Sequence, residues 1–154
     1  PAHGLGPDRF RGNVDDAFVV KAAVGGEPLT VPAFEYPYEV IYIEDEARAF
    51  VAAVLADDLS FDRYLVGTGE QVTLAEFVES VNERVETADL RLESTESGMQ
   101  LGSKPPIDAS RLRTDLEWEP THTVEEAIDA YVTWLEKNPD AWAFDPSNAP
   151  WNEP

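Results

Sequence analysis

The stretch from Glu39 to Ala53 constrains the fold of this chain more strongly than any other. It reads EVIYIEDEARAFVAA. Its first part, Val40 to Ile43, is rich in β-branched and aromatic residues, a composition typical of a short buried strand. Asp45 follows and can cap a helix by accepting a hydrogen bond from a free N–H group of the first turn. The stretch therefore predicts a strand that runs directly into a helix, as in α/β proteins.

The helix expected after Asp45 has one apolar face. Its apolar residues recur at three- and four-residue spacing, and they are Ala47, Phe50, Val51, Val54 and Leu55. A face of this kind normally packs against the core of a globular domain. We expect the helix to end near Asp57-Asp58.

Local start and stop signals predict most of the other elements. Thr73 with Glu76, and Thr123 with Glu126, have the spacing of a capping box ahead of an apolar-periodic helix. Asn138-Pro139 is expected to end the second of these helices. Further helices are expected at 14–24 and 108–116, and extended segments at 28–31, 63–66 and 90–93.

These elements predict an α/β fold of about five helices with short strands. We expect residues 1–138 to form one domain. Residues 139–154 are expected to form a C-terminal tail that is rich in proline and tryptophan.

The chain is strongly acidic. It has 31 Asp and Glu against 11 Lys and Arg, a formal net charge of −20, and its acidic residues are spread over the predicted helices rather than gathered in one block. This charge repels nucleic acid and anionic membranes, so neither is an expected partner. An acidic surface keeps a folded protein hydrated at high salt, where repulsion is screened. We therefore expect a halophilic source, with an ordinary acidic protein as the alternative.

Several absences bear on location and on metal binding. The sequence has no cysteine, which excludes disulfides and thiolate metal sites and suits a cytoplasmic protein. Its two histidines, His3 and His122, are far apart in sequence and predict no metal site. No secretory signal is visible at Pro1, and no apolar stretch approaches the length of a membrane span.

The sequence shows no credible nicotinamide site. In Gly4-Leu5-Gly6 and in Gly67-Thr68-Gly69 the third glycine of a dinucleotide fingerprint is replaced, by Arg9 and by Val72 respectively, so both are expected to be turns. No Tyr-x-x-x-Lys pair is present. Acidic pairs such as Glu44-Asp45 are interpreted as caps or solvated faces, because they arise by chance in so acidic a chain. We therefore predict no catalytic and no cofactor-binding residue in this chain.

Scarce cations are better candidates for ligand binding than abundant acids. Arg9, Arg11, Lys104 and Arg111 stand in or beside predicted loops. There they can hold a phosphate or carboxylate through charge-assisted hydrogen bonds. The alternative is a surface ion pair between each of them and one of the many carboxylates.

Aromatic residues just before the opening strand complete the candidate site. Phe34, Tyr36 and Tyr38 either line a pocket or cover the core. The predicted substrate-binding set consists of Arg9, Arg11, Tyr36, Tyr38, Lys104 and Arg111.

Five segments follow one another in an order found in one enzyme family. They are His3–Pro7, Val40–Asp45, Tyr64–Gly69, Thr73–Phe77 and Asp108–Pro120. They resemble, in turn, the Tyr-Gly-Pro-Gly turn, a strand with its cap, the Y-N-V-G-x-G strand and turn, a helix start, and the D-x-S-K-x-x-x-x-L-G-W-x-P segment. These belong to the C-terminal part of NAD-dependent epimerases/dehydratases of the extended short-chain dehydrogenase/reductase family. One departure is Tyr38, which stands where the family often has an arginine that helps to hold a diphosphate.

The resemblance implies that this chain is the small C-terminal substrate domain of such an enzyme, with the Rossmann domain absent. The missing N-terminal Rossmann domain would carry NAD(P) and the catalytic Tyr and Lys. The present part would bind a small anionic or sugar substrate, such as a nucleotide sugar, without being catalytic alone and without binding a cofactor. The parent would be an epimerase, a dehydratase or a related reductase, with a homodimer as one possible state.

An alternative from another class is a stand-alone protein-interaction module that is derived from the same domain. Trp142 and Trp151 in the C-terminal tail would then form the contact.

Overall fold

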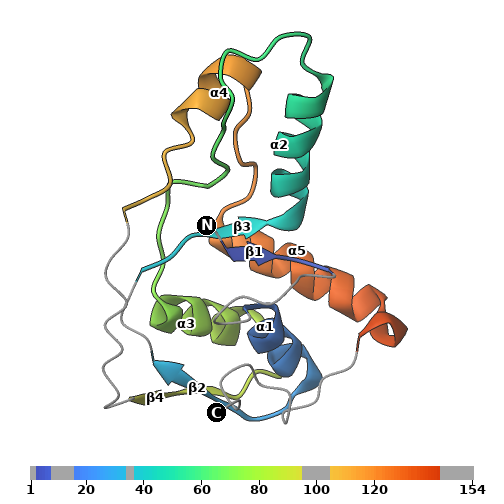
Figure 1. Ribbon diagram of the computed structural model, residues 1–154. Coiled ribbons are helices and arrows are strands. Elements are labelled where there is room, and N and C mark those ends of the chain that lie inside the picture. Colours follow the sequence, from blue (N-terminus) through green and yellow to red (C-terminus); the bar gives the residue numbers. More distant parts are fainter. Residues whose placement is uncertain (1–2, 8–15, 34–36, 95–104, 143–154) are drawn as a thin grey trace, which may run out of the picture.

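A computed structural model describes residues 3–7, 16–33, 37–94 and 105–142 of the chain (Figure 1). This described part is an α/β fold with five α-helices and two pairs of short parallel strands. In chain order the elements are β1 (His3–Leu5), α1 (Asp16–Gly25), β2 (Leu29–Ala33), β3 (Val40–Tyr42), α2 (Ile43–Leu55), α3 (Leu74–Arg84), β4 (Leu90–Ser94), α4 (Ser110–Leu116), α5 (Val124–Lys137) and the 3-10 turn η1 (Pro139–Ala141). The predicted α/β class, with about five helices and short strands, is thereby confirmed.

The strands form two separate pairs. β1 runs parallel to β3, with His3 opposite Val40 and Leu5 opposite Tyr42. β2 runs parallel to β4, with Leu29 opposite Leu90. Parallel neighbours need long crossover connections, and here each crossover contains at least one helix. Helix α1 contacts strands of both pairs and lies between them (Figure 1).

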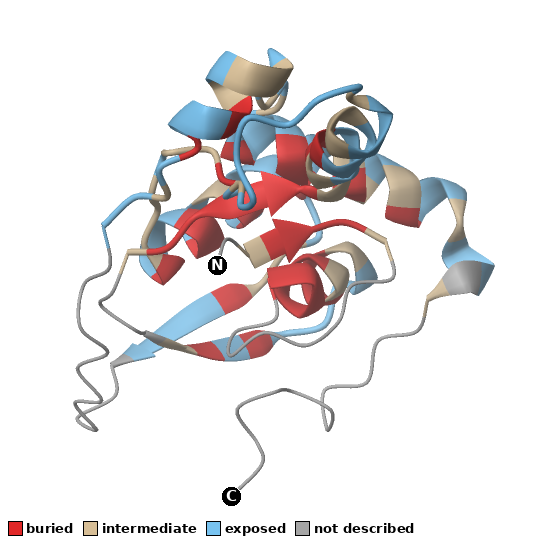
Figure 2. Cartoon of the chain, turned by 45° about the horizontal axis from the view of Figure 1, so that its top comes forward, coloured by how far each residue is buried: buried red, intermediate tan, exposed pale blue. Residues whose placement is uncertain are grey.

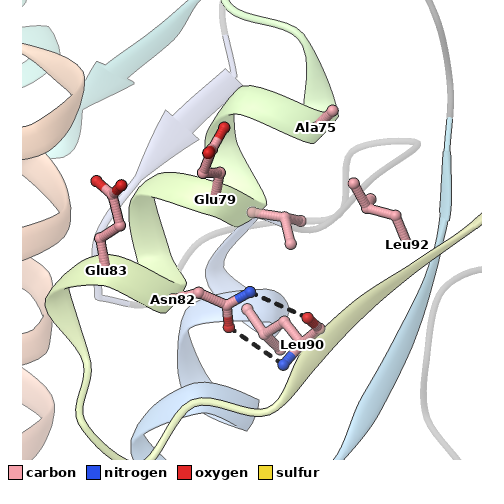
Figure 3. Close-up of a pocket in the computed structure, with 7 residues that line it drawn as sticks. Ala75, Glu79, Asn82, Glu83, Leu90 and Leu92 are labelled. Atoms are coloured by element: carbon pink, nitrogen blue, oxygen red, sulfur yellow. Dashed lines mark hydrogen bonds between the residues drawn. The ribbon is translucent and has the colours of Figure 1, made fainter.

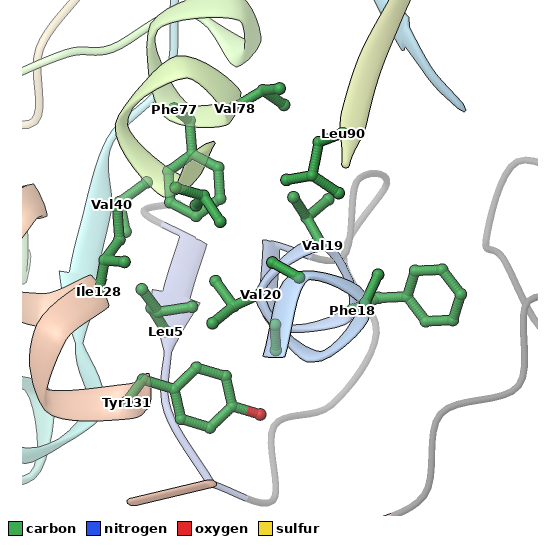
Figure 4. Close-up of a cluster of buried hydrophobic side chains, with 14 of the residues drawn as sticks. Leu5, Phe18, Val19, Val20, Val40, Phe77, Val78, Leu90, Ile128 and Tyr131 are labelled. Carbon is green, nitrogen blue, oxygen red and sulfur yellow. The ribbon is translucent and has the colours of Figure 1, made fainter. Parts of the chain in front are cut away.

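The main core lies where α1, α3 and α5 meet the β1–β3 pair (Figure 4). Its buried side chains include Leu5, Val20, Phe77, Ile128 and Tyr131. Burying a large apolar side chain contributes about 1.5–3 kcal/mol, so this cluster dominates the stability of the fold. A second, smaller cluster holds α2 and α4 together, and it consists of Ile41, Ala49, Ala109, Leu112 and Trp118. Figure 2 shows the strands of the β1–β3 pair as almost entirely buried.

Both predicted capping boxes are present. The side chain of Thr73 accepts a hydrogen bond from the N–H of Glu76, whose carboxylate accepts one from the N–H of Thr73. Thr123 and Glu126 make the same reciprocal pair at the start of α5. Helix α5 ends just before Asn138-Pro139, as predicted. The extended segment expected at 90–93 is strand β4.

Residues 63–66 do not form the predicted strand. The hydroxyl of Tyr64 donates a hydrogen bond to Oδ2 of Asp115, and Leu65 is half exposed. This segment is therefore tied to α4 by a side chain instead of by a strand ladder.

Asp45 does not cap α2, contrary to the prediction. The helix already begins at Ile43, which places Asp45 inside its first turn. The fully buried carboxylate instead accepts hydrogen bonds from the guanidinium of Arg48 and from the backbone N–H groups of Thr121 and His122. Asp45 therefore ties α2 to the loop that precedes α5.

The ionisation of Asp45 follows from this environment. Burial by itself would raise the pKa of the carboxyl group. Hydrogen bonds from Arg48, Thr121 and His122 outweigh that effect and lower the pKa of Asp45 from 3.8 to about 2. The carboxylate is thus charged at every pH at which the protein is expected to work.

The apolar face of α2 does not pack against the core. Phe50, Val51, Val54 and Leu55 are all exposed, whereas Asp45 and Ala49 on the opposite side are buried. The expected apolar periodicity is present, but the face it defines points away from the rest of the described chain.

Candidate functional site

Three polar side chains from separate parts of the chain meet in one cluster. His3 begins β1, Asp16 begins α1, and Tyr38 lies just before β3. Oδ1 of Asp16 accepts a hydrogen bond of 2.9 Å from the Tyr38 hydroxyl, and Oδ2 lies 3.1 Å from Nδ1 of His3. The rings of His3 and Tyr38 are 4.5 Å apart between centroids.

The carboxylate of Asp16 holds the His3–Asp16–Tyr38 cluster together. Asp16 is buried, and a buried carboxylate is costly unless other groups donate to it. Segment 8–15, with Arg9 and Arg11, leads directly into Asp16, and Tyr36 stands two residues before Tyr38. The cluster therefore fixes the points at which these two segments join the fold. Arg9, Arg11, Tyr36 and also Lys104 lie outside the described residues.

The two described members of the predicted set lie in different parts of the fold. Tyr38 is buried in the main core, where its hydroxyl is engaged by Asp16. Arg111 is exposed on α4, and its guanidinium carbon lies 4.6 Å from the centroid of the Phe61 ring, in a cation–π arrangement. The structure does not bring these two side chains together. Their role in substrate binding stays a prediction.

Glu39 is a buried acid whose function the sequence alone did not reveal. Its Oε2 accepts a hydrogen bond of 3.0 Å from the N–H of Gly69, and its Oε1 accepts one from the N–H of Ile107. One carboxylate thus holds both the turn at 67–69 and the loop before α4 against the start of β3. The only signal in the sequence is an acidic residue placed directly before an apolar strand.

Gly67 has no room for a side chain, so its replacement by alanine tests this arrangement. A Cβ atom there would lie 2.6 Å from Oε2 of Glu39 and 2.6 Å from Cβ of Ile107. We expect Gly67→Ala to lower the free energy of unfolding by about 1–3 kcal/mol, the usual cost of overpacking. Urea unfolding followed by circular dichroism measures this change.

Gly25→Ala is the matched control for that measurement. A Cβ at Gly25 meets only the flexible side chain of Glu27 at 3.9 Å, so its effect should be small. Equal stabilities of the two variants would contradict the packing described at Gly67.

The glycine turns do not fit a dinucleotide cofactor. A Cβ at Gly6 would collide with the side chain of Ile43, so this glycine serves the contact between the β1 end and α2. The turn at 67–69 is filled by the carboxylate of Glu39, which would repel a pyrophosphate. Neither turn therefore offers the open backbone cradle that such a cofactor requires. That the chain binds no cofactor stays a prediction.

A shallow groove of about 390 Å³ lies between α3 and β4 (Figure 3). Ala75, Val78, Leu90 and Leu92 give it apolar walls. Its charged lining consists of Glu79 and Glu83, with no described cation. Asn82 beside them uses its amide to bond both the N–H and the C=O of Leu90. An anionic sugar phosphate would face two carboxylates here, so the groove is a poor match for that ligand.

The described residues contain no group of three or more His, Asp or Glu side chains that could hold a metal ion. Across the same residues, every helix is too short or too polar to cross a membrane.

Comparison with known proteins places the fold. No protein-family model matches the sequence, and no curated protein matches it. Solved structures do match. UDP-glucose 4-epimerase from Thermotoga maritima, solved with UDP-glucose, superposes with a TM-score of 0.71 and 22% identity, over 89% of this chain and 44% of its own. The dTDP-glucose 4,6-dehydratase from Bacillus anthracis, solved with NAD, superposes with a TM-score of 0.72 and 19% identity, over 92% of this chain and 44% of its own.

A third match differs in its chemistry. A partial-consensus L-threonine 3-dehydrogenase gives a TM-score of 0.72 and 24% identity, over 88% of this chain and 47% of its own. The three are thus an epimerase, a dehydratase and a dehydrogenase, and this chain spans less than half of the length of each. At these identities the likeness establishes the fold alone.

Proposed function

We propose that this chain is the substrate-binding portion of an NAD-dependent, nucleotide-sugar epimerase/dehydratase-like enzyme, and that it is not catalytic alone. One observation carries the proposal. The neighbours match nearly the whole of this chain, 88% to 92% of it in the three comparisons, but only 44% to 47% of their own length. The remainder of such an enzyme, an N-terminal Rossmann domain, would bind NAD(P) and supply the catalytic residues.

The described residues are consistent with this division into a cofactor-binding domain and a substrate-binding portion. The two turns tested as dinucleotide sites, at 4–6 and 67–69, are filled by Ile43 and Glu39 and leave no cradle for a dinucleotide. The His3–Asp16–Tyr38 cluster holds Asp16, which directly follows the segment with Arg9 and Arg11 in the sequence, and Tyr38, which stands two residues after Tyr36. In this proposal the chain contributes binding energy that orients an anionic or sugar substrate toward the cofactor held by the other domain.

The surface supports a further part of the proposal, a cytoplasmic protein from a halophile. Only three of the described acidic side chains are buried, namely Asp16, Glu39 and Asp45. The others lie at or near the surface of a chain with a net charge of −20. Such a surface is suited to concentrated salt, where its self-repulsion is screened.

The alternative of a stand-alone interaction module has less support. It places the contact on Trp142 and Trp151 of the tail. The indole N–H of Trp142 donates a hydrogen bond of 2.9 Å to the carbonyl of Leu135, and its ring packs against the main core. Trp142 is therefore already used within the fold. Trp151 lies outside the described residues.

Titration with UDP-glucose in concentrated salt tests the proposal. The chain alone, and the chain joined to the segment encoded directly upstream of Pro1, are followed by tryptophan fluorescence and by NAD binding. We expect the joined protein to bind both ligands, and Arg111→Gln to weaken UDP-glucose binding about tenfold, equivalent to about 1.4 kcal/mol. Arg91→Gln, which removes an exposed arginine paired with Asp89, should leave the affinity unchanged.

Two outcomes would count against the proposed function. The first is a start codon at or near Pro1, so that no upstream segment exists. The second is a joined protein that binds neither NAD nor UDP-glucose. If Arg91→Gln weakens UDP-glucose binding as much as Arg111→Gln does, the loss reflects the overall charge of the protein. Arg111 would then no longer be assigned to the substrate site.

A further inference from the structure

Helix α2 is amphipathic in the opposite sense to a normal surface helix. Its bulky apolar side chains are the exposed ones, at 62% for Phe50, 55% for Val51, 80% for Val54 and 76% for Leu55. The side that contacts β3 and α4 carries the small Ala49 and the polar Asp45, both buried. Surface helices normally turn their large apolar residues inward, because water contact with them is unfavourable.

The exposed face stands out against the rest of the surface. Between Ala47 and Ala56 the only charged residue is Arg48, in a chain that is otherwise crowded with acids. Leu59, Phe61 and Leu65 continue the exposure of large apolar side chains along the following segment. Clustered exposure of this kind marks an interaction surface in soluble proteins.

The strands next to α2 point to the same conclusion. β1 and β3 form a parallel pair of only three residues each, and every residue of β3 is buried. Parallel strands are characteristic of larger sheets that are covered on both faces, and a lone two-stranded pair is marginal in water. This pair therefore has the properties of one part of a wider sheet, and α2 leaves it toward the end of the molecule opposite the β2–β4 pair (Figure 1).

We propose that the exposed apolar face of α2, made of Phe50, Val51, Val54 and Leu55, is the surface on which the nucleotide-binding half of the enzyme docks. This inference rests on the proposed function and assigns the contact between its two halves. The occupant is an α/β unit that brings an apolar face of its own and extends the β1–β3 sheet. Its size is set by the half or more of each neighbouring enzyme that this chain does not match.

A second copy of this chain is a weaker candidate for the occupant. Each copy carries a net charge of −20, so self-association is opposed by charge repulsion to the extent that salt does not screen it. A dimer through α2 would also leave the β1–β3 pair without additional strands.

Cysteine labelling tests the assignment cleanly, because the natural chain has no cysteine. Val54→Cys places a single thiol on the proposed surface, and Glu136→Cys places one on the exposed side of α5. Each variant is reacted with a maleimide in concentrated salt, with and without the separately produced segment encoded upstream of Pro1. We expect that segment to slow labelling at position 54 at least tenfold and to leave labelling at position 136 unchanged.

Each outcome of the labelling experiment has a separate meaning. A complex that forms and binds NAD but protects neither thiol overturns the docking surface and leaves the proposed function intact. Failure of the upstream segment to bind the chain at all, or its absence from the gene, overturns both. Protection of position 54 in the chain alone, increasing with its concentration, would assign the surface to a second copy and overturn the proposal.

The double variant Val54→Gln/Leu55→Gln provides an independent measurement. Both positions are exposed in the described chain, so we expect the isolated variant to keep the circular dichroism spectrum of the parent. Its affinity for the upstream segment, measured by calorimetry, should fall at least tenfold. Leu92→Gln, at an exposed leucine on β4, is the control that should retain full affinity.

Discussion

Replacement of Asp45 by alanine is expected to lower the free energy of unfolding by about 3–5 kcal/mol, the usual cost of removing one member of a buried charged network. The guanidinium of Arg48 and the N–H groups of Thr121 and His122 would lose their shared acceptor. A domain of this size has about 5–15 kcal/mol of stability in total, so the loss would be severe. Urea unfolding in concentrated salt, followed by circular dichroism, measures it.

Two further variants make the Asp45 prediction specific. Asp45→Asn keeps the shape and one acceptor oxygen, so it should cost less than alanine. Asp58→Asn removes an exposed acid just beyond the end of α2 and should change stability by less than about 0.5 kcal/mol. A loss as small for Asp45→Ala as for Asp58→Asn would contradict the network.

The lowered pKa of Asp45 predicts that the free energy of unfolding decreases at acidic pH. Its pKa is about 2 in the folded chain against 3.8 for the free side chain. A lowered pKa stabilises the fold above the unfolded value, and that stabilisation is lost as pH falls from about 4 toward 2. The shift corresponds to about 2 kcal/mol. Asp45→Asn should therefore unfold with a shallower dependence on pH than the parent across that interval.

Transfer to low salt is expected to unfold the chain, and this is the second of the two largest expected effects. A net charge of −20 on one domain repels itself, and the Debye length grows from about 3 Å at 1 M salt to about 30 Å at 0.01 M. We expect a native circular dichroism spectrum at 1 M salt or above, and loss of helical signal on dialysis to 0.01 M.

A variant with fewer surface acids separates charge repulsion from other effects of salt. Glu79, Glu83 and Glu86 are exposed in and just after α3. Changing all three to glutamine should shift the unfolding midpoint to lower salt. A parent chain that stays fully folded at 0.01 M salt would refute the halophilic interpretation, and an unchanged midpoint in the variant would point to a salt effect other than charge screening.

The elements that the sequence predicted well are those whose signals are local. The capping boxes at Thr73 and Thr123 need only residues three apart, and the stop at Asn138-Pro139 needs only the proline ring. Asp45 shows the opposite case. Its pattern fits a cap, but its backbone donors at Thr121 and His122 lie more than seventy residues further along the chain. Periodicity likewise showed that α2 has an apolar face without showing which way that face would turn.

Prediction of the candidate site was limited for a similar reason. Residue type and position near loops predict Arg111 and Tyr38 as substrate contacts. The structure places Arg111 on α4, against the Phe61 ring, and Tyr38 in the main core. The buried acids Asp16 and Glu39 organise this region, and their partners come from separate elements. In a chain with 31 acidic residues, composition gives no means of telling these two from the solvated majority.

The two hydrogen bonds between the Asn82 amide and the backbone of Leu90 affect how the chain behaves in a crowded solution. The amide occupies the N–H and the C=O that β4 would otherwise offer to an additional strand at its first residue. An open strand edge is a template for pairing between molecules and hence for aggregation. One side chain thus imitates a neighbouring strand and blocks this end of β4, and this protection persists in concentrated salt, which screens the repulsion between acidic surfaces.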